Sequence, residues 1–286
     1  MPQTDELPVI ALCWGTAIGT PLEALIEAAA GAGLGAITLT AGMYEASRAA
    51  GRSDAQLRRL LSEAGVKVHA IDPLISVLPG TPRPADVPPE NRAYFEFTEE
   101  RCYAAAEALE AETINLAHFG GGEVREAQFV ECLIPLARRA RSHGVRLTLE
   151  FLPESAIPDL ATAQRIVAAV DAASLRLMLD TWHLARSGGT LAQLAAVPKG
   201  LIGALQISDR REPPPGTTYT PMGGRLLPGD GELALVALLR TLLTREPELT
   251  VGVEVFSDEL RRLPAGEIAA RVAASTRAVL RQALAV

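Results

Sequence analysis

The sequence predicts an α/β protein of the (β/α)8 type, the closed TIM barrel. The chain has 286 residues, close to the roughly 250 residues that such a barrel needs. Eight short apolar segments alternate along it with Ala- and Leu-rich amphipathic segments, and no linker-like stretch divides it. We therefore expect one TIM-barrel domain over residues 1–286.

The eight apolar segments are the expected strands. They cover residues 9–14, 36–41, 66–71, 113–119, 145–151, 175–180, 202–208 and 250–256. Their nearly continuous apolar character is typical of parallel strands that are buried on both faces. Segments such as 21–33 and 54–65 have apolar residues three and four positions apart and end in glycine, which predicts helices. An open doubly wound sheet would show the same alternation, but the residues at the strand ends favour the barrel.

Composition and charge restrict the classes of function. Hydrophobic residues make up 48% and charged residues 21%, and the net charge is −7. An acidic chain is poorly suited to nucleic acid, whose phosphates require a basic surface. No apolar run reaches about 18 residues, the length of a membrane span. The beginning of the chain has no pattern of a secretory signal, and three cysteines indicate neither a disulfide framework nor a zinc ribbon. We expect a cytoplasmic protein that acts on a small molecule, with no nucleic-acid or membrane partner.

Three connections after predicted strands are candidates for function. Residues 79–89 and 209–230 are long, and loops of such length in a compact domain are often functional. The second contains Arg211, Arg225 and several glycines, and we expect it to close over a substrate. The first is as readily explained as a surface insertion. The glycine-rich residues 119–123 follow the fourth strand, where backbone N–H groups can bind an anion.

Four consecutive predicted strands deliver an oxygen-bearing side chain at their carboxyl ends. These side chains are Glu150, Asp180, Gln206 and Glu254. The carboxyl ends of barrel strands meet at one face, which carries the chemistry of TIM-barrel enzymes. A buried carboxylate is costly unless it is paired or bound to a cation. Three carboxylates and one amide oxygen suit Mn2+ or Mg2+, with Co2+ as an alternative, so we expect one divalent metal ion per chain.

The combination of these residues with their neighbours resembles a known family. Glu150, the sequence Asp180-x-x-His183, Gln206 and Glu254, together with RLLPGDGEL at 225–233, are similar to the xylose-isomerase-like barrels of the sugar phosphate isomerase/epimerase superfamily. The resemblance implies that these four side chains hold one divalent metal. It also implies that the two glutamates act as an acid/base pair and that the metal stabilises a cis-enediolate. Sugar epimerases usually have histidine at the third position; glutamine there is similar to hydroxypyruvate isomerases and 3-dehydroshikimate dehydratases.

Several polar residues are candidates for substrate binding. His183 and Arg225 resemble the family's substrate-binding histidine and the arginine that fixes a substrate oxygen, and Arg211 competes with Arg225 for that role. His118 and His69 are candidates to line the cavity floor, and each is as readily a satisfied histidine of the barrel interior.

An apolar wall over the metal is the expected counterpart of these polar residues. Trp14 is the main candidate, because it follows the first predicted strand; the other aromatic residues near strand ends are Phe119, Phe151, Trp182 and Phe256. Such a wall would exclude water and grip the carbon skeleton of a substrate. Core packing explains each of them individually about as well.

The leading functional hypothesis is a metal-dependent sugar (phosphate) isomerase or epimerase that acts on a small polyhydroxy carbonyl compound. The first alternative is a dehydratase, a lyase that also removes an α-proton but expels a β-hydroxyl. An endonuclease of the same barrel type needs a histidine-rich zinc site, and the chain has four histidines. The remaining alternative is a catalytically silent binding protein. A homodimer is expected because dimers are common among relatives.

Overall fold

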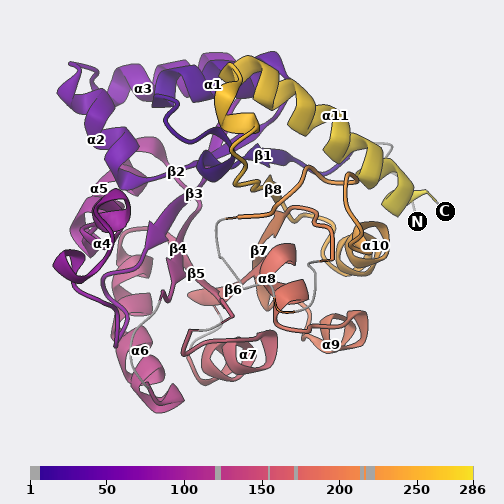
Figure 1. Ribbon diagram of the computed structural model, residues 1–286. Helices are drawn as coiled ribbons and strands as arrows, with labels where there is room; N and C mark the ends of the chain where they lie inside the picture. Colours follow the sequence, from indigo (N-terminus) through magenta and orange to yellow (C-terminus); the bar gives the residue numbers. More distant parts are fainter. Residues whose placement is uncertain are drawn as a thin grey trace.

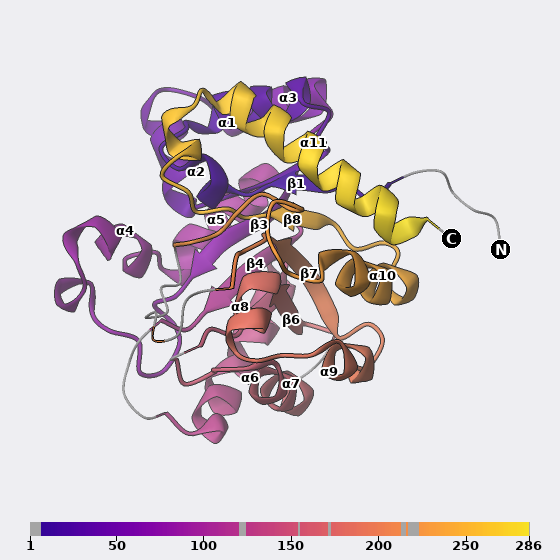
Figure 2. The same cartoon turned by 45° about the vertical axis from the view of Figure 1, so that its right-hand side comes forward.

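The chain forms a closed barrel of parallel strands surrounded by helices (Figures 1 and 2). This computed structural model describes residues 7–119, 124–153, 155–170, 173–212, 216 and 223–285. Each strand pairs with the next in chain order, and β1 closes the ring by pairing with β8. The predicted (β/α)8 TIM barrel is therefore confirmed.

The strands occupy the predicted apolar segments with different ends. They are β1 (Ile10–Leu12), β2 (Ala36–Leu39), β3 (Lys67–Leu74), β4 (Thr113–Ala117), β5 (Arg146–Glu150), β6 (Leu175–Asp180), β7 (Ile202–Ile207) and β8 (Val251–Val253). Most are shorter than predicted, because residues such as Trp14 and Phe256 lie beyond the last strand hydrogen bond yet remain buried. In contrast, β3 continues to Leu74, which pairs with Leu116 after a register shift. The extension brings Asp72 into the strand.

Eleven α-helices and four short 3-10 helices are found in the described part of the chain. The α-helices are α1 (Leu22–Gly31), α2 (Ala41–Ala49), α3 (Asp54–Ala64), α4 (Arg92–Phe95), α5 (Glu99–Leu109), α6 (Glu126–Ser142), α7 (Leu160–Ala169), α8 (Thr181–Arg186), α9 (Leu191–Ala196), α10 (Leu235–Arg245) and α11 (Ala265–Leu284). The 3-10 helices are η1 (Trp14–Ala17), η2 (Pro84–Asp86), η3 (Pro89–Asn91) and η4 (Leu260–Arg262). No helix in the described ranges combines the length and apolar character needed to cross a membrane.

Local signals in the sequence explain where the helices begin and end. Ser53 and Gln56 form a capping box at the start of α3, in which each side chain accepts a hydrogen bond from the other's backbone N–H. The same helix ends at Gly65, whose φ of 65° is readily adopted by glycine. These signals place the helix where its apolar periodicity predicts it.

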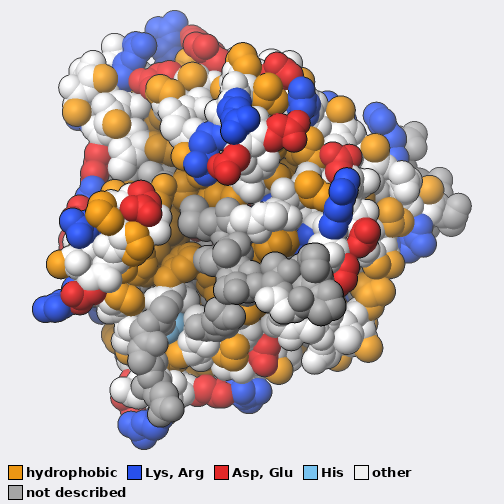
Figure 3. All heavy atoms as spheres, viewed as in Figure 1, with side chains coloured by type: hydrophobic (Ala, Val, Ile, Leu, Met, Phe, Trp, Pro, Cys, Tyr) orange, Lys and Arg blue, Asp and Glu red, His pale blue; other side chains and the backbone are white. Residues whose placement is uncertain are grey.

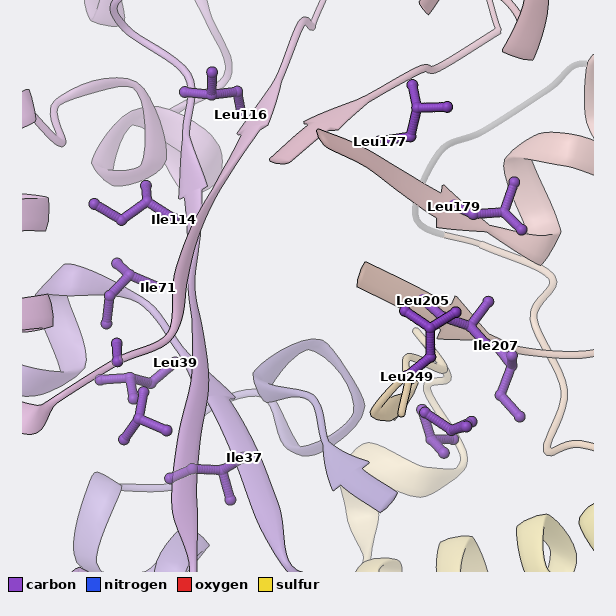
Figure 4. Packing of buried hydrophobic residues seen from close by; sticks show 14 of the residues in the cluster. Ile37, Leu39, Ile71, Ile114, Leu116, Leu177, Leu179, Leu205, Ile207 and Leu249 are labelled. Atoms are coloured by element: carbon purple, nitrogen blue, oxygen red, sulfur yellow. The ribbon is translucent and has the colours of Figure 1, made fainter. Parts of the chain in front are cut away.

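The main core lies between the strands and the surrounding helices. Figure 4 shows strand residues such as Ile114, Leu116, Leu205 and Ile207 on the outer side of the barrel, within the buried apolar cluster. Because successive strand side chains point to opposite faces, the residues between these positions point into the barrel. Because side chains alternate between the two faces, each of the strands β4–β7 places a polar side chain inside the barrel.

Candidate active site

A cavity of about 160 Å3 opens at the carboxyl ends of the strands. Its polar wall consists of Asp72, Asn91, Glu150, His183, Arg225 and Glu254. Its other wall is apolar and comes from the ends of β1, β4 and β8 and from the connection that follows β3. In Figure 3, hydrophobic side chains border the hollow near the centre of this face, and most charged side chains lie toward the periphery. The cavity therefore has a charged side and an apolar side.

The predicted ligand residues meet on the charged side. One ligand atom of each of Glu150, Asp180 and His183 lies within 4.8 Å of the others. Gln206 is paired in register with Asp180 on the neighbouring strand. Glu254 directly follows β8, and its backbone N–H donates a hydrogen bond of 3.0 Å to Ile207. All four predicted ligands are at most 6% exposed.

Arg225 neutralises part of this acidic cluster. Its Nη1 lies 2.6 Å from Asp180 Oδ2 and 3.3 Å from Glu254 Oε2, and the side chain is 1% exposed. Its aliphatic and guanidinium surface also contacts aromatic rings, with Cζ 5.1 Å from the centre of Phe256 and 5.8 Å from that of Trp182. Arg225 is thus held at the boundary between the charged and the apolar walls.

A turn organised by Asp209 holds Arg225 in place. The backbones of Asp209 and Leu226 exchange two hydrogen bonds of 2.9 and 2.7 Å. The Asp209 carboxylate accepts hydrogen bonds from the backbone N–H groups of Gly229 and Leu233, both at 3.0 Å. A Cβ at Gly231 would lie 2.3 Å from the Asp209 carboxylate, so glycine is required for this close approach. The resemblance around residues 225–233 therefore has a structural basis in this turn.

Two functional residues that the sequence analysis missed form a hydrogen-bond network beneath the ligands. Asn115 Nδ2 donates to Asp72 Oδ1 and to Glu150 Oε2, both at 2.9 Å. Asn115 Oδ1 accepts a hydrogen bond of 2.9 Å from Thr148. A signal was available, because Asn115 lies within a predicted apolar strand and Asp72 directly follows one; both are polar residues where an apolar one is expected.

The same network fixes the orientation of Gln206. Its Nε2 donates a hydrogen bond of 3.1 Å to Asp72 Oδ2. A carboxylate accepts hydrogen bonds, so this contact assigns the amide nitrogen to the Asp72 side. The Oε1 atom is then buried with no hydrogen-bond partner among the described residues. An unpaired buried oxygen is costly and indicates a ligand position beside it.

Burial dominates the acid–base properties of the cluster. It raises the pKa of Glu150 and of Glu254 well above the ordinary value of a glutamate, and neighbouring carboxylates add to the effect. Burial also raises the pKa of Asp72, against the hydrogen bonds from Asn115 and Gln206. The pKa of His183 falls to about 4, chiefly through burial. At neutral pH His183 is therefore uncharged, and Arg225 is the positive charge within the cluster.

These residues fit a divalent cation. The site contains four buried carboxyl groups (Asp72, Glu150, Asp180 and Glu254) and one guanidinium, which contacts Asp180 and Glu254. Buried carboxylates that outnumber their cationic partners are stabilised by a bound cation. The oxygen atoms and the neutral imidazole are donors that divalent metals accept, and the unpaired Gln206 Oε1 provides a further oxygen.

Other candidates lie elsewhere in the structure. His118 is fully buried; its Nε2 lies 3.1 Å from the Pro79 carbonyl oxygen, and its Nδ1 accepts a hydrogen bond from the Ala156 N–H. Both ring nitrogens are therefore occupied by backbone, and the ring packs edge-on against Phe129 rather than lining the cavity. His69 lies at the opposite end of the barrel, 2.9 Å from Glu112. Neither histidine lines the cavity floor, because local partners hold both.

The remaining candidates divide between the cavity and its surroundings. Trp14, Phe119 and Phe256 line the cavity, whereas Phe151 and Trp182 are buried outside its lining. Arg211 is exposed and does not line it. Closure of residues 209–230 over a substrate stays a prediction, because residues 213–215 and 217–222 lie outside the described ranges. The expected anion-binding glycines at 120–122 also lie outside them.

Comparisons with known proteins place this barrel in a family. The xylose isomerase-like TIM barrel model matches residues 26–282. An inosose isomerase of Halalkalibacterium halodurans is 30% identical over 140 residues, 48% of this chain and 49% of that protein. A Streptomyces coelicolor protein named "Putative hydroxypyruvate isomerase" is 27% identical over 238 residues, 75% of this chain and 80% of that protein.

The match to the inosose isomerase thus spans about half of that relative's length. A crystal structure of the IolI protein with a bound zinc atom has a TM-score of 0.81 to this chain, at 20% identity, and covers 97% of this chain and 100% of that one. This likeness supports the fold. The family model extends over nearly the whole barrel, and on that ground the chain belongs to the xylose isomerase-like TIM barrel family.

Proposed function

We propose that this protein is a metal-dependent isomerase or epimerase that moves a proton at a carbon next to a carbonyl group of a small hydroxycarbonyl substrate. The observation that carries the proposal is the cluster of four buried carboxyl groups beside the unpaired Gln206 Oε1, at the mouth of the barrel. The relatives named as inosose isomerase and hydroxypyruvate isomerase support this reaction class.

Four side chains are the proposed metal ligands: Glu150, Asp180, Gln206 and Glu254. The neutral His183 imidazole lies beside them, with Nε2 3.5 Å from Glu150 Oε1 and 3.8 Å from Asp180 Oδ2. Oxygen donors predominate, so we propose Mn2+ or Mg2+, with Co2+ as an alternative. A bound divalent ion would supply a positive charge where negative charge develops on the substrate oxygens.

The two glutamates are the proposed acid/base pair. Strands β5 and β8 are three steps apart around the barrel, so Glu150 and Glu254 approach a bound carbon from different sides. Burial raises the pKa of both side chains, which brings each closer to the value at which a carboxyl group gives and takes a proton near neutral pH. One glutamate then removes the α-proton, and the other returns a proton to the neighbouring carbon or to the opposite face.

Three neighbouring side chains support this proton transfer. Arg225, anchored on Asp180 and Glu254, is positioned to bind a substrate oxygen. Trp14 and Phe256 pack against each other with ring centres 5.9 Å apart and line the cavity. Exclusion of water strengthens the electrostatic interactions inside such a site.

Exchange of the substrate α-proton with solvent tests the proposal directly. The protein would be loaded with Mn2+ and incubated in D2O with inososes, hydroxypyruvate, ketoses and the simple hydroxyketone 1-hydroxypentan-2-one, and deuterium incorporation would be followed by NMR. We expect exchange with at least one compound and its loss in Glu254→Gln. Ultraviolet absorbance of an aromatic product from 3-dehydroshikimate would instead favour the dehydratase. Metal binding without exchange of any probe would contradict the proposed reaction.

A further inference from the structure

We propose that the substrate is amphipathic, with a neutral hydroxycarbonyl head and a short body that carries no hydroxyl groups. The inference rests on the proposed function for the chemistry of the head. The body is assigned from the apolar wall of the cavity, which the reaction itself does not require.

The wall opposite the carboxylates is built largely from aromatic and aliphatic side chains. The connection after β3 folds back over the barrel mouth through η2, η3 and α4, and it contributes Val87, Pro88 and Phe95 to the lining. The ring of Phe95 meets that of Phe119 from the end of β4, at 6.4 Å between centres. Phe95 is 8% exposed and Val87 is partly buried, whereas Pro88 is exposed, so the wall extends from the buried interior to the rim of the mouth.

The aromatic wall continues toward the charged side of the cavity. Trp14 lies between Tyr94 and Phe256, with ring centres 5.2 and 5.9 Å away. Among the described lining residues outside the charged cluster, polar side-chain groups come from Asn91, the Tyr94 hydroxyl and the indole N–H of Trp14. The two ends of a bound molecule therefore meet different surroundings.

A polyhydroxy chain is poorly matched to this wall. Each hydroxyl group that leaves water needs a hydrogen-bond partner, and the apolar wall has few to give. An apolar pocket disfavours an isosteric ligand with one added hydroxyl by about 10²-fold. A ketose with a hydroxyl group on every carbon of its tail should therefore bind less well than the same chain without them.

The charge of the cavity indicates a neutral head. Arg225 is the only lysine or arginine among the described lining residues, and its guanidinium already contacts Asp180 and Glu254. Neither lysine nor arginine occurs in the segments outside the described ranges. Phosphate groups in proteins are usually bound by several cationic or N–H donors. Arg225 is thus the one cationic side chain that the described lining offers to a phosphate ester, and a neutral hydroxyketone or hydroxyaldehyde fits this charge better.

The volume limits the size of the body. The cavity of about 160 Å3 is close to the engineered cavity of about 150 Å3 that binds benzene. The substrate thus has about the bulk of one six-membered ring. A hydroxycarbonyl head with a three-carbon tail meets this limit.

A matched pair of five-carbon ketones tests the inference. 1-Hydroxypentan-2-one and D-xylulose have the same hydroxymethyl ketone head and the same carbon chain, and D-xylulose adds hydroxyl groups at C3, C4 and C5. Binding to the Mn2+-loaded protein would be measured by calorimetry, and exchange of the α-protons in D2O would be measured by NMR. We expect 1-hydroxypentan-2-one to be favoured at least about 10²-fold, in affinity and in kcat/KM for exchange.

Two valine variants locate the body of the ligand. Val87→Thr adds one hydroxyl to the lining with little change of size, and should reduce the preference for 1-hydroxypentan-2-one by roughly tenfold, within the range of a single hydrogen bond. Val77→Thr is the matched control, because Val77 packs against the core outside the cavity lining, and should leave the preference unchanged. An equal preference in wild type and Val87→Thr would overturn the placement of the body against this wall.

The outcomes separate this inference from the proposed function. Equal or better binding and exchange of D-xylulose would overturn the inference while supporting the isomerase chemistry. Tight binding of 1-hydroxypentan-2-one without exchange of either ketone would support the inference and count against the proton transfer. Binding of neither ketone would overturn the inference, because the unoxygenated ketone is its direct probe.

Discussion

The two halves of the barrel mouth differ in what they contribute to the cavity. Glu150, Asp180, Gln206 and Glu254 lie at or next to the carboxyl ends of strands β5–β8, so this half supplies most of the charge. The β1–β4 half supplies the aromatic wall apart from Phe256, which follows β8, and Asp72 and Asn115 of this half form hydrogen bonds with Gln206 and Glu150. The difference suggests that one half determines the reaction and that the other determines orientation and the choice of substrate.

The largest expected effect falls on the β5–β8 half. Glu150→Gln and Glu254→Gln keep an oxygen that can bind metal but lose the group that carries a proton. We expect each variant to retain substantial metal and to lose turnover by about 10²–10⁴-fold, the usual contribution of general acid–base catalysis. Turnover and metal content by elemental analysis would be measured together.

The exposed Glu259 provides a control for the glutamate variants, because Glu259→Gln removes a carboxylate outside the cavity lining. This variant should keep wild-type turnover. Full turnover of Glu150→Gln or Glu254→Gln would leave that glutamate as a ligand only, and would weaken the assignment of the reaction to this half.

A smaller effect is expected from the β1–β4 half. Asp72→Asn removes the carboxylate that fixes the amide of Gln206 and receives the hydrogen bond from Asn115. Loss of such a supporting partner usually lowers metal affinity about 10–100-fold. Titration with Mn2+ would measure this loss, and Asp230→Asn, which alters an exposed carboxylate, is the control. Unchanged affinity in Asp72→Asn would show that the two halves are independent in metal binding.

The sequence predicts the site residues of the β5–β8 half better than those of the β1–β4 half, for a physical reason. Glu150 and Gln206 stand out because a polar residue ends, or lies next to the end of, an apolar strand, and the closed barrel brings such ends together. Asp72 was missed because the apolar run stops before it, although β3 continues to Leu74. The role of Val87 and Phe95 depends on how the connection after β3 folds over the mouth, which periodicity does not encode. The prediction that His118 lines the cavity floor was wrong for a similar reason, because the partners of its ring are backbone atoms from two other connections.

Arg225 lies where the charged and the apolar walls meet, because it contacts Asp180 and Glu254 on one side and the ring of Phe256 on the other. Arg225→Ala should raise KM by about tenfold, which is the loss of one hydrogen bond to a charged group, and should change metal affinity less. Arg225→Lys keeps the charge but loses the planar guanidinium, so its KM should lie between those of the wild type and Arg225→Ala. Steady-state kinetics with saturating Mn2+ would measure the KM of both variants. A KM equal to that of the wild type in Arg225→Ala would exclude a substrate contact.

The smallest expected effect concerns stability after metal removal. The folded-state pKa values of Glu150, Glu254 and Asp72 are raised, mainly by burial, above the unfolded values of about 4. Their contribution to the free energy of unfolding is therefore fully present below about pH 4 and is lost as pH rises through the folded pKa values. A bound cation favours the ionised carboxylates and offsets this loss.

Metal removal should thus cost more stability at pH 8 than at pH 5, because more of these carboxyl groups would ionise without a cation at the higher pH. Each kcal/mol lost corresponds to a fall in Tm of roughly 2–4 °C for a chain of about this size. The test compares Tm with Mn2+ and with EDTA across this pH range. In Glu150→Gln/Glu254→Gln the difference should depend less on pH, because the replacements do not titrate. If the difference in Tm of the wild type did not change with pH, ionisation of the buried carboxyl groups would not explain why a cation stabilises this site.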